Sequence, residues 1–316
     1  MKRFWLWTIN LIVVLLGVIL VAVSLNTNFQ ILDLLSDGRL IYAGILFCAF
    51  ICLLGLNRRT QALFAAGLTL FALWPIVGLY SFATKCSNSR TSTVRILAVN
   101  IGADHNKNYE RLMKFVQEEQ PDIIGISEVT KDWRTALTSE LQVRYPFFYI
   151  QESCGGMALF SRYRLNSSQI SRTDQIERPR IQTVVDMRGE PVTMILAHLA
   201  TPQNPSFKLR QDDFTQLAAE VKNIAGPTIL FGDFNCCQWS SLFQRLVENT
   251  HLVDTSAGFG IQPTWCQSPW FLLFPIDQVL ISQEFCTCGR CVGKDVGSDH
   301  LPLIVDVYLK PTNSPK

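Results

Sequence analysis

The sequence predicts an α/β domain of packed β-sheets with helices on the outside, preceded by three transmembrane helices. Two observations lead to this prediction. Three uncharged apolar segments lie within residues 1–84, and beyond them several β-rich segments follow one another with few amphipathic helices between them. Strict alternation of strands and helices would indicate a parallel sheet, whereas this mixture is typical of packed sheets with helices outside.

The apolar segments cover residues 4–23, 40–56 and 62–80 and contain no charged side chain. Each approaches the length of about 20 residues that a membrane-spanning helix needs. A cleaved signal peptide would explain only the first segment, and no small-residue cleavage site accompanies it. The sequence therefore predicts a membrane anchor over residues 1–84, a polar linker over 85–93 and a second domain over 94–311.

Basic residues beside these segments predict their orientation. Lys2 and Arg3 precede the first segment, Arg58 and Arg59 separate the second from the third, and the loop at 24–39 carries two acids and one arginine. Basic flanks favour the cytoplasmic side. We therefore expect the N-terminus in the cytoplasm and everything after the third segment outside it. Two basic residues shortly after the third segment favour the opposite orientation, more weakly.

The ten cysteines agree with an oxidising compartment. Cys48 and Cys52 lie in the second apolar segment, where packing is the expected role, and eight others follow from residue 86 onwards. An even number of cysteines outside the cytoplasm favours disulfide bonds. The run "CTCGRC" at 286–291 also suggests zinc ligands, but no CxxC pair with a histidine at finger spacing accompanies it. Disulfides or free thiols are therefore favoured over a metal centre.

The net charge of +2 is not evenly distributed. Residues 1–84 hold five basic and two acidic side chains, which leaves 23 basic and 24 acidic ones in the remainder. The second domain thus lacks the basic excess expected of a protein that binds duplex DNA tightly.

The elements of the second domain are read from hydrophobic periodicity. Segments rich in Val, Ile and Leu that end abruptly at polar residues indicate strands, and apolar residues at helical spacing indicate helices. We expect strands at 94–100, 122–129, 146–151, 156–161, 228–235, 274–282 and 297–309, helices at 109–120, 132–142 and 207–225, and a hairpin of 181–187 with 192–199.

Polar residues recur at the ends of these apolar strands. A single such residue is most simply a cap or a turn at the strand end, but the number of them is hard to attribute to capping. We expect the set to meet at one rim of the packed sheets, where loops lie on a rigid scaffold. Its members are Asn100, Glu128, His198, Asp233, Asn235, Asp277, Asp299 and His300.

These residue types favour one chemistry. Carboxylates such as Glu128 and Asp299 suit Mg²⁺ or Mn²⁺. A carboxylate–imidazole pair of Asp277 and His300 would fix the ring's tautomer and raise its basicity. Asparagine and histidine donors stabilise charge on a phosphoryl group. Hydrolysis of a phosphate ester uses such a combination of metal, activated water and hydrogen-bond donors.

The motifs "SEV" at 127–129, "GDFN" at 232–235, "IDQV" at 276–279 and "GSDHLPL" at 297–303 carry these residues. Their order and spacing resemble the endonuclease/exonuclease/phosphatase superfamily, which includes DNase I-like nucleases, AP endonucleases, neutral sphingomyelinases and inositol-polyphosphate phosphatases. The resemblance spans 94–309 and implies the DNase I-like four-layer α/β/β/α sandwich, with a catalytic domain over 94–311.

The resemblance also implies roles. Glu128 resembles the principal metal ligand of the family, helped by Asn100, and Asp299 resembles a second metal-associated carboxylate. The implied cofactor is Mg²⁺ or Mn²⁺. Asp233 resembles the residue that orients or deprotonates the attacking water, and Asn235 the donor to the scissile phosphate.

Asp277 resembles the partner of His300 in the same family. His198 resembles the histidine of the DNase I and sphingomyelinase branches, where the AP-endonuclease branch has a tyrosine. The chain departs from the pattern in two places. Gln278 stands where many membrane-anchored bacterial relatives have histidine, and two cysteines follow "GDFN". Neither departure removes a catalytic group.

Three further features have simpler explanations. "SDH" does not indicate a serine-hydrolase triad, because neighbours on an extended strand point to opposite faces. Lys208 and Arg210 are expected on a solvated helix face, although contact with substrate phosphate is the alternative. Trp265, Trp270 and Phe271 are expected to pack in the core or on a strand, and an aromatic lip near the active site is the alternative.

The resemblance thus implies a metal-dependent phosphodiesterase. The apolar segments and their basic flanks predict that it is multi-pass in a bacterial inner membrane, with its catalytic domain in the periplasm. The expected substrate is a phosphodiester, as in nuclease-like relatives. The alternative is a phospholipid head group, as for a sphingomyelinase, or another small phosphoester, which the membrane anchor and the near-neutral domain favour. An inactive membrane-tethered binding module is disfavoured because every expected catalytic position is filled.

Overall fold

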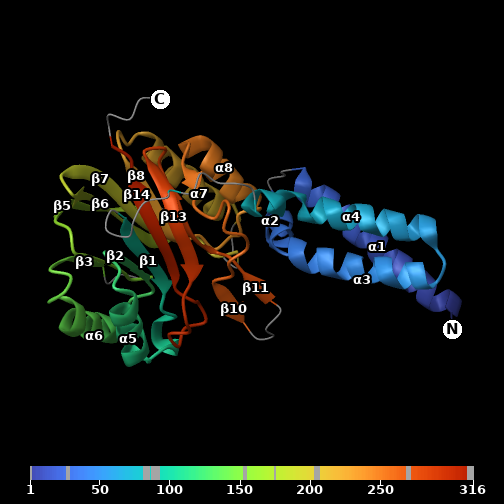
Figure 1. Cartoon of the computed structure of the whole chain (residues 1–316), viewed down its shortest axis with the longest axis horizontal. Coiled ribbons are helices and arrows are strands. Elements are labelled where there is room, and N and C mark those ends of the chain that lie inside the picture. The colour runs from blue at the N-terminus through green and yellow to red at the C-terminus, as the bar shows by residue number, and fades with distance from the viewer. Residues whose placement is uncertain are drawn as a thin grey trace.

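The computed structural model describes residues 2–25, 29–80, 86, 93–151, 155–173, 176–202, 207–267 and 272–311. Figure 1 shows an arm of N-terminal helices attached to a larger body in which two sheets are packed together. The arm contains α1 (Lys2–Ser24), α2 (Gln30–Asp37), α3 (Arg39–Gly55), α4 (Arg59–Val77) and the short helix η1 (Gly78–Tyr80).

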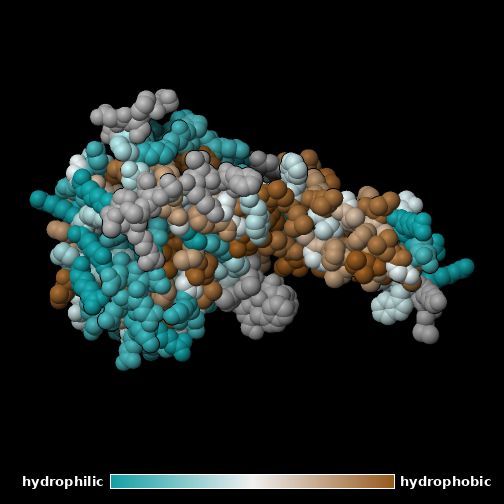
Figure 2. All heavy atoms as spheres, viewed as in Figure 1, coloured by the Kyte–Doolittle hydropathy of each residue, from teal (hydrophilic) through white to brown (hydrophobic). Residues whose placement is uncertain are grey.

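Two helices of the arm, Arg3–Ser24 and Arg59–Tyr80, are long and apolar enough to cross a membrane. A third crossing passes the same test only when α2 and α3 are taken together, across a bend of 64°. Figure 2 shows the contrast in surface between the largely hydrophobic arm and the largely hydrophilic body. The segment expected at 40–56 coincides with α3, whereas helix α2 occupies part of the segment expected to be a loop.

Two six-stranded sheets form the body. The first has the order β13-β14-β1-β2-β4-β3 and the second the order β5-β6-β7-β8-β12-β9. The first sheet consists of β1 (Val94–Asn100), β2 (Ile123–Ser127), β3 (Phe147–Gln151), β4 (Met157–Ser161), β13 (Phe285–Val292) and β14 (Leu303–Leu309). The second consists of β5 (Leu165–Thr173), β6 (Ile176–Met187), β7 (Glu190–His198), β8 (Thr228–Asp233), β9 (Val253–Asp254) and β12 (Asp277–Ile281).

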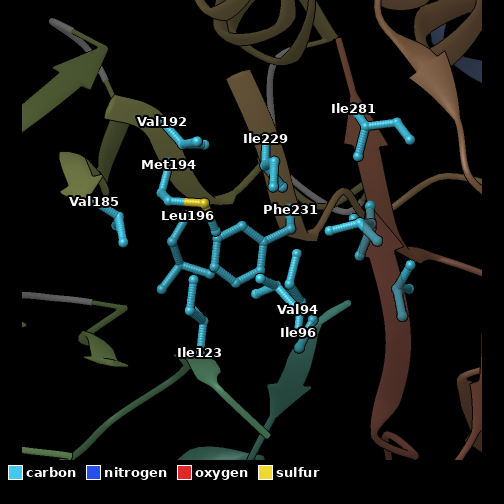
Figure 3. Packing of buried hydrophobic residues seen from close by; sticks show 14 of the residues in the cluster. Val94, Ile96, Ile123, Val185, Val192, Met194, Leu196, Ile229, Phe231 and Ile281 are labelled. Carbon is cyan, nitrogen blue, oxygen red and sulfur yellow. The ribbon is translucent and has the colours of Figure 1, made fainter. Parts of the chain in front are cut away.

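The expected four-layer sandwich is confirmed by the way in which the helices and sheets bury their apolar faces. Helices α5 (Tyr109–Glu119) and α6 (Lys131–Leu141) cover the first sheet, and α7 (Phe207–Lys222) and α8 (Ser241–Thr250) cover the second. Inward-facing side chains from both sheets form the core between them (Figure 3). Gly125 on β2 keeps this core closed, since a Cβ there would lie 2.3 Å from the ring of Phe231.

The arm meets the body next to a separate hairpin, β10 (Trp265–Gln267) and β11 (Leu272–Phe274). Ile76 and Leu79, at the end of α4 and in η1, are buried in one cluster with Cys237, Trp239 and Ile276 of the body. The carbonyl of Leu79 also accepts backbone hydrogen bonds from Gly258 and Gly260. The arm is therefore packed against the body and not only connected to it by the linker.

Most of the linker expected at 85–93 lies outside the described residues. Cys86 within it forms a disulfide bond with Cys288 on β13. Cys236 and Cys237 are buried free thiols, so these two neighbours of "GDFN" are not joined to each other or to another cysteine. The zinc alternative for "CTCGRC" loses one of its cysteines to the disulfide.

Candidate active site

The strand register brings the predicted polar residues to one rim of the sandwich. In the first sheet, β1 and β2 run parallel, and Asn100 pairs with Ser127, the residue before Glu128. In the second sheet, Asp233 at the end of β8 lies opposite His198 of β7 and Asp277 of β12. The same edge of both sheets therefore carries the candidate residues, as the sequence predicts.

A buried carboxylate–imidazole pair lies at the centre of this rim. His300 Nδ1 is 2.8 Å from Asp277 Oδ2. His300 Nε2, on the opposite side of the ring, is 3.8 Å from Asp233 Oδ2. Asp277 and Asp233 are each 1% exposed and His300 is 6% exposed. The imidazole is thus held between two carboxylates, with Nδ1 facing Asp277 and Nε2 facing Asp233.

Asp233 also connects this pair to the first sheet. Its Oδ2 accepts a hydrogen bond of 3.0 Å from Nδ2 of Asn100 and lies 3.4 Å from Nε2 of His198. Asn100 donates a second hydrogen bond, of 3.1 Å, to Oε1 of Glu128. His198 lies 3.8 Å from the same Glu128 oxygen. Six of the eight predicted residues therefore form one continuous cluster.

Local backbone geometry supports these positions. Glu128 has a φ of 64°, in the left-handed region that few non-glycine residues adopt, and such strain is often found at functional sites. Gly232, just before Asp233, has a φ of 130°, and a Cβ there would lie 2.1 Å from the carbonyl oxygen of Ala197. Only glycine allows β8 to approach β7 this closely before it presents Asp233.

Asn235 lies beyond the strand and not within it, contrary to the strand expected at 228–235. β8 ends at Asp233, and Asn235 has a φ of 53°. Its backbone N–H donates to Asp233 Oδ1 at 2.8 Å, and its side-chain amide donates to the carbonyl of Leu199 at 2.9 Å. The direction of the Asn235 side chain is therefore set by a turn next to the cluster and not by the alternation of side chains along a continuous strand.

Asp299 is placed differently from the other candidates. It is exposed, and its Oδ2 accepts a hydrogen bond of 3.1 Å from the indole of Trp265. Trp265 also forms an isolated bridge with His300. Trp265 is half-buried and packs against Phe274, so it combines the expected packing role with a position beside the site.

The charges around His300 change its ionisation. Burial by itself lowers the pKa of the imidazole, but the negative charges of Asp277 and Asp233 and the hydrogen bond that the ring donates to Asp277 outweigh burial, and Asp299 adds to them. The pKa of His300 is thereby raised from 6.5 to about 10. At neutral pH the ring is a cation that donates from both nitrogens.

The donor set fits a hard divalent cation. The side chain of Glu128 is 30% exposed, so its carboxylate is open to an ion at the mouth of the cluster. Among the described residues, carboxylate oxygens of Asp233 and Asp277 also lie within 4.8 Å of each other and of a ring nitrogen of His300, which offers no ligand atom while the ring is protonated. Carboxylate oxygens are the ligands that Mg²⁺ and Mn²⁺ prefer. Asn100, in contrast, turns its amide N–H towards the carboxylates, and its Oδ1 accepts from the N–H of Gly102.

The two basic residues of α7 have different environments. Lys208 is 82% exposed and pairs with Asp212, which agrees with the expected solvated helix face. Arg210 is 1% exposed, and the expectation of a solvated position is wrong for it. Its guanidinium donates to the carbonyl of Ala200 at 2.7 Å and to that of Asn235 at 2.9 Å. The burial of Arg210 could not be predicted from the sequence, because a helical period alone does not show which polar side chain faces inward.

Comparison with known proteins agrees with this arrangement. The profile described as the Endonuclease/Exonuclease/phosphatase family matches residues 97–300. No curated protein sequence matches the chain.

Solved structures share the fold at low sequence identity. An endonuclease/exonuclease/phosphatase from Beutenbergia cavernae is 20% identical with a TM-score of 0.59, covering 69% of this chain and 72% of its own. The human Nocturnin catalytic domain with a bound sulfate anion is 17% identical with a TM-score of 0.59, covering 71% and 96%. The D. rerio TDP2 complexed with a single-strand DNA product is 17% identical with a TM-score of 0.56, covering 69% and 99%.

Proposed function

The chain belongs to the endonuclease/exonuclease/phosphatase family, and from this premise we propose that it is a divalent-metal-dependent phosphodiesterase that works beside a membrane. Family membership makes it a phosphoester hydrolase. The observation that carries the proposal further is the continuous cluster from Asp277 through His300, Asp233 and Asn100 to Glu128. It combines a cationic donor (His300), a buried carboxylate (Asp233) and a partly exposed carboxylate (Glu128) at one rim. Hydrolysis of a phosphate ester requires such a combination.

Each side chain has a defined task in this proposal. Glu128 would hold Mg²⁺ or Mn²⁺, with Asp299 assisting and Asn100 orienting the Glu128 carboxylate through its amide N–H. The ion supplies Lewis-acid stabilisation of phosphoryl charge when bound. Asp233 accepts a proton from the attacking water and orients it.

The remaining residues act on the phosphoryl group. His300, a cation held by Asp277, donates a hydrogen bond to a phosphoryl oxygen, and His198 lies on the opposite side of Asp233 to do the same. Asn235 supplies a further donor when its amide leaves the carbonyl of Leu199. Donors prearranged around developing charge provide a large part of the rate enhancement in hydrolases.

The arrangement of the arm supports an extracytoplasmic catalytic domain on a three-span anchor. Figure 1 shows that the N-terminus and the connection between α3 and α4 lie at the end of the arm far from the body. Helix α2 and η1 lie at the near end, against the body. The positive flanks at the far end assign that end to the cytoplasm, and the disulfide between Cys86 and Cys288 suits an oxidising compartment on the other side.

A phosphodiester of nucleic acid is the first candidate substrate. It is supported by the family description and by the fold shared with the TDP2 that was complexed with a single-strand DNA product. A near-neutral domain would bind such a strand without the strong salt dependence of a basic duplex binder.

A phospholipid head group or another small phosphoester is the second candidate. One observation favours it: Cys237 and Ile276, each within two residues of Asn235 or Asp277, are packed against Ile76 and Leu79 of the arm. The catalytic rim is therefore the rim nearest to the apolar helices. An inactive binding module is disfavoured because the whole cluster is present.

A substrate panel tests the proposal. The purified full-length protein in detergent or nanodiscs is given Mg²⁺ or Mn²⁺ with single-stranded and plasmid DNA, vesicles of sphingomyelin or phosphatidylinositol, and bis(4-nitrophenyl) phosphate. We expect metal-dependent cleavage of at least one substrate, which is lost in Glu128→Ala and in His300→Ala. Absence of cleavage throughout the panel, or activity that survives His300→Ala, contradicts the proposal.

A further inference from the structure

Helix α2 has its polar and apolar faces reversed relative to a surface helix of a soluble protein. Asp33 and Ser36 are 3% and 2% exposed, whereas Phe29, Ile31 and Leu34 are 65%, 62% and 47% exposed. A surface helix in water would turn its apolar stripe inward. The reversed arrangement suits a helix that has lipid on its outer side and protein on its polar side.

Asp33, the first carboxylate on the polar side of α2, is connected to the active-site segment, residues 233–237, through Arg210. Asp33 Oδ2 lies 3.3 Å from Nη2 of Arg210, and the two side chains are 2% and 1% exposed. Arg210 donates in turn to the carbonyl oxygens of Ala200 and Asn235. The loops that follow His198 and Asp233 are thus both held by a guanidinium whose counter-charge comes from the arm.

The second carboxylate acts directly. Asp37 Oδ1 accepts the backbone N–H of Cys237 at 3.0 Å. Cys237 is two residues beyond Asn235 and fully buried. The segment 233–237 is therefore held at its middle by Arg210 and at its end by Asp37.

These contacts matter because the segment is strained and the charge is buried. Asn235 keeps a φ of 53°, a conformation that persists only when its surroundings determine it. A buried guanidinium that loses its partner is strongly unfavourable, so it would be expected to draw in water or move. Either response would release the carbonyl of Asn235.

We propose that Asp33 and Asp37 are positioning residues for the catalytic centre, so that helix α2 of the membrane anchor fixes the segment 233–237 for catalysis. The inference rests on the proposed phosphodiesterase function, because it assigns a role to the same site. Neither carboxylate touches substrate; both act through the backbone that carries Asp233 and Asn235.

The test compares Asp33→Asn and Asp37→Leu with wild type in the full-length protein, using bis(4-nitrophenyl) phosphate with Mn²⁺; leucine at 37 removes the acceptor that asparagine would keep for the N–H of Cys237. We expect kcat to fall about ten- to a hundredfold, since displacements of about 1 Å at a catalytic group have effects of this size. KM is expected to stay within about twofold, because the substrate-contacting side chains are retained. Asp33→Glu keeps the charge and is expected to recover part of kcat.

Asp212→Asn is the matched control. Asp212 lies on α7 beside Arg210, but its side chain is 46% exposed and pairs with the exposed Lys208. Its removal takes away the same charge without touching the active-site segment, so kcat should remain that of wild type. In a double-mutant cycle, Asp33→Asn is expected to add little to the loss caused by Arg210→Gln, because the two residues act as one unit.

Hydrogen exchange supplies a readout that does not require activity. Amides of 233–237 are expected to exchange faster in Asp33→Asn and Asp37→Leu than in Asp212→Asn, while amides of β1 and β14 keep their wild-type rates. If Asp33→Asn does not fold, Asp37→Leu carries the test, because it leaves Arg210 paired.

The outcomes separate the two proposals. If wild type cleaves no substrate, the proposed function fails, and the exchange data alone decide whether α2 holds the segment. If wild type is active and both Asp33→Asn and Asp37→Leu retain its kcat and its exchange rates, the positioning role is wrong while the function stands. Faster exchange throughout the body would also overturn it, since this would indicate general destabilisation.

Discussion

Asp277 and His300 make the shortest side-chain to side-chain contact among the candidate residues, with 2.8 Å between Oδ2 of the carboxylate and Nδ1 of the imidazole. Asp277 begins β12 in the second sheet, and His300 precedes β14 in the first. The pair therefore joins the two sheets at the catalytic rim, and its geometry depends on how the sheets pack.

Asp277→Asn is expected to lower kcat by about 10²- to 10⁴-fold, the range typical of groups that support acid–base catalysis. The isosteric amide keeps the packing but removes the charge that stabilises the imidazolium and can favour the wrong tautomer. Steady-state kinetics with bis(4-nitrophenyl) phosphate measure the effect. His251→Asn is the control, because His251 is exposed and asparagine tolerates its φ of 56°. Equal losses in both variants would contradict the pairing.

The raised pKa of His300 gives a pH dependence with a definite sign. The folded protein favours the protonated ring. The contribution of His300 to stability is therefore complete below pH 6.5 and is lost as the pH rises through about 10. Titration of the metal-free protein by NMR should show a protonated His300 ring at pH 8. Asp277→Asn removes a negative charge and should lower that pKa. A ring that is already neutral at pH 7 in wild type would contradict this.

Removal of the metal should abolish activity. Chelation is expected to stop cleavage, and Mn²⁺ or Mg²⁺ added in excess to restore it. Glu128→Gln should weaken the apparent affinity for the ion about tenfold or more, since a charged oxygen ligand becomes a neutral one. Calorimetric titration of the ion measures this. Glu118→Gln, at an exposed residue that pairs with Lys294, should bind the ion as wild type does.

The two cysteines after "GDFN" should be inert in the folded protein. Burial raises the pKa of the Cys236 thiol far above its usual range, and burial together with the Asp37 charge does the same for Cys237. The thiolate is the reactive form. Mass spectrometry after treatment with a maleimide at pH 7 should find both unlabelled, and both labelled after denaturation. Labelling of either in the folded protein would show that the active-site segment opens.

The predicted orientation of the anchor can be tested through the disulfide between Cys86 and Cys288. In cells, Cys86 and Cys288 should be found joined on non-reducing gels, and a C-terminal alkaline phosphatase fusion should be active. The single variant Cys86→Ser should abolish the mobility difference between reduced and non-reduced protein. An inactive fusion, together with free Cys86, would place the domain in the cytoplasm.

The elements that carry strong periodicity could be predicted from the sequence. β1 has the expected bounds, Val94–Asn100, and α5 ends one residue before the expected 120. Short strands such as β9, with two residues, and β11, with three, give no periodic signal. The sequence does not predict β13, because "FCTCGRC" lacks the apolar alternation of a half-buried strand.

The catalytic cluster was predictable because its members stand at strand ends, and parallel or adjacent strands bring such ends together. The contribution of α2 to the active site could not be predicted from the sequence. Asp33 and Asp37 are four residues apart, a spacing that places both on one face of a helix. In a short segment between apolar runs, however, two acids most simply indicate a solvated loop. Only the packing of the arm on the body shows that Asp33 is buried and that Asp37 is partly buried.

The reversed faces of α2 have a consequence for the range over which the enzyme searches. A domain held only by a flexible linker would sweep a hemisphere above its anchor. Here, the polar side of α2 is docked on the body and Phe29, Ile31 and Leu34 face outward. On the membrane anchor proposed above, the catalytic rim is therefore expected to stay at one height above the lipid, and a phospholipid substrate would reach it by lateral diffusion in two dimensions.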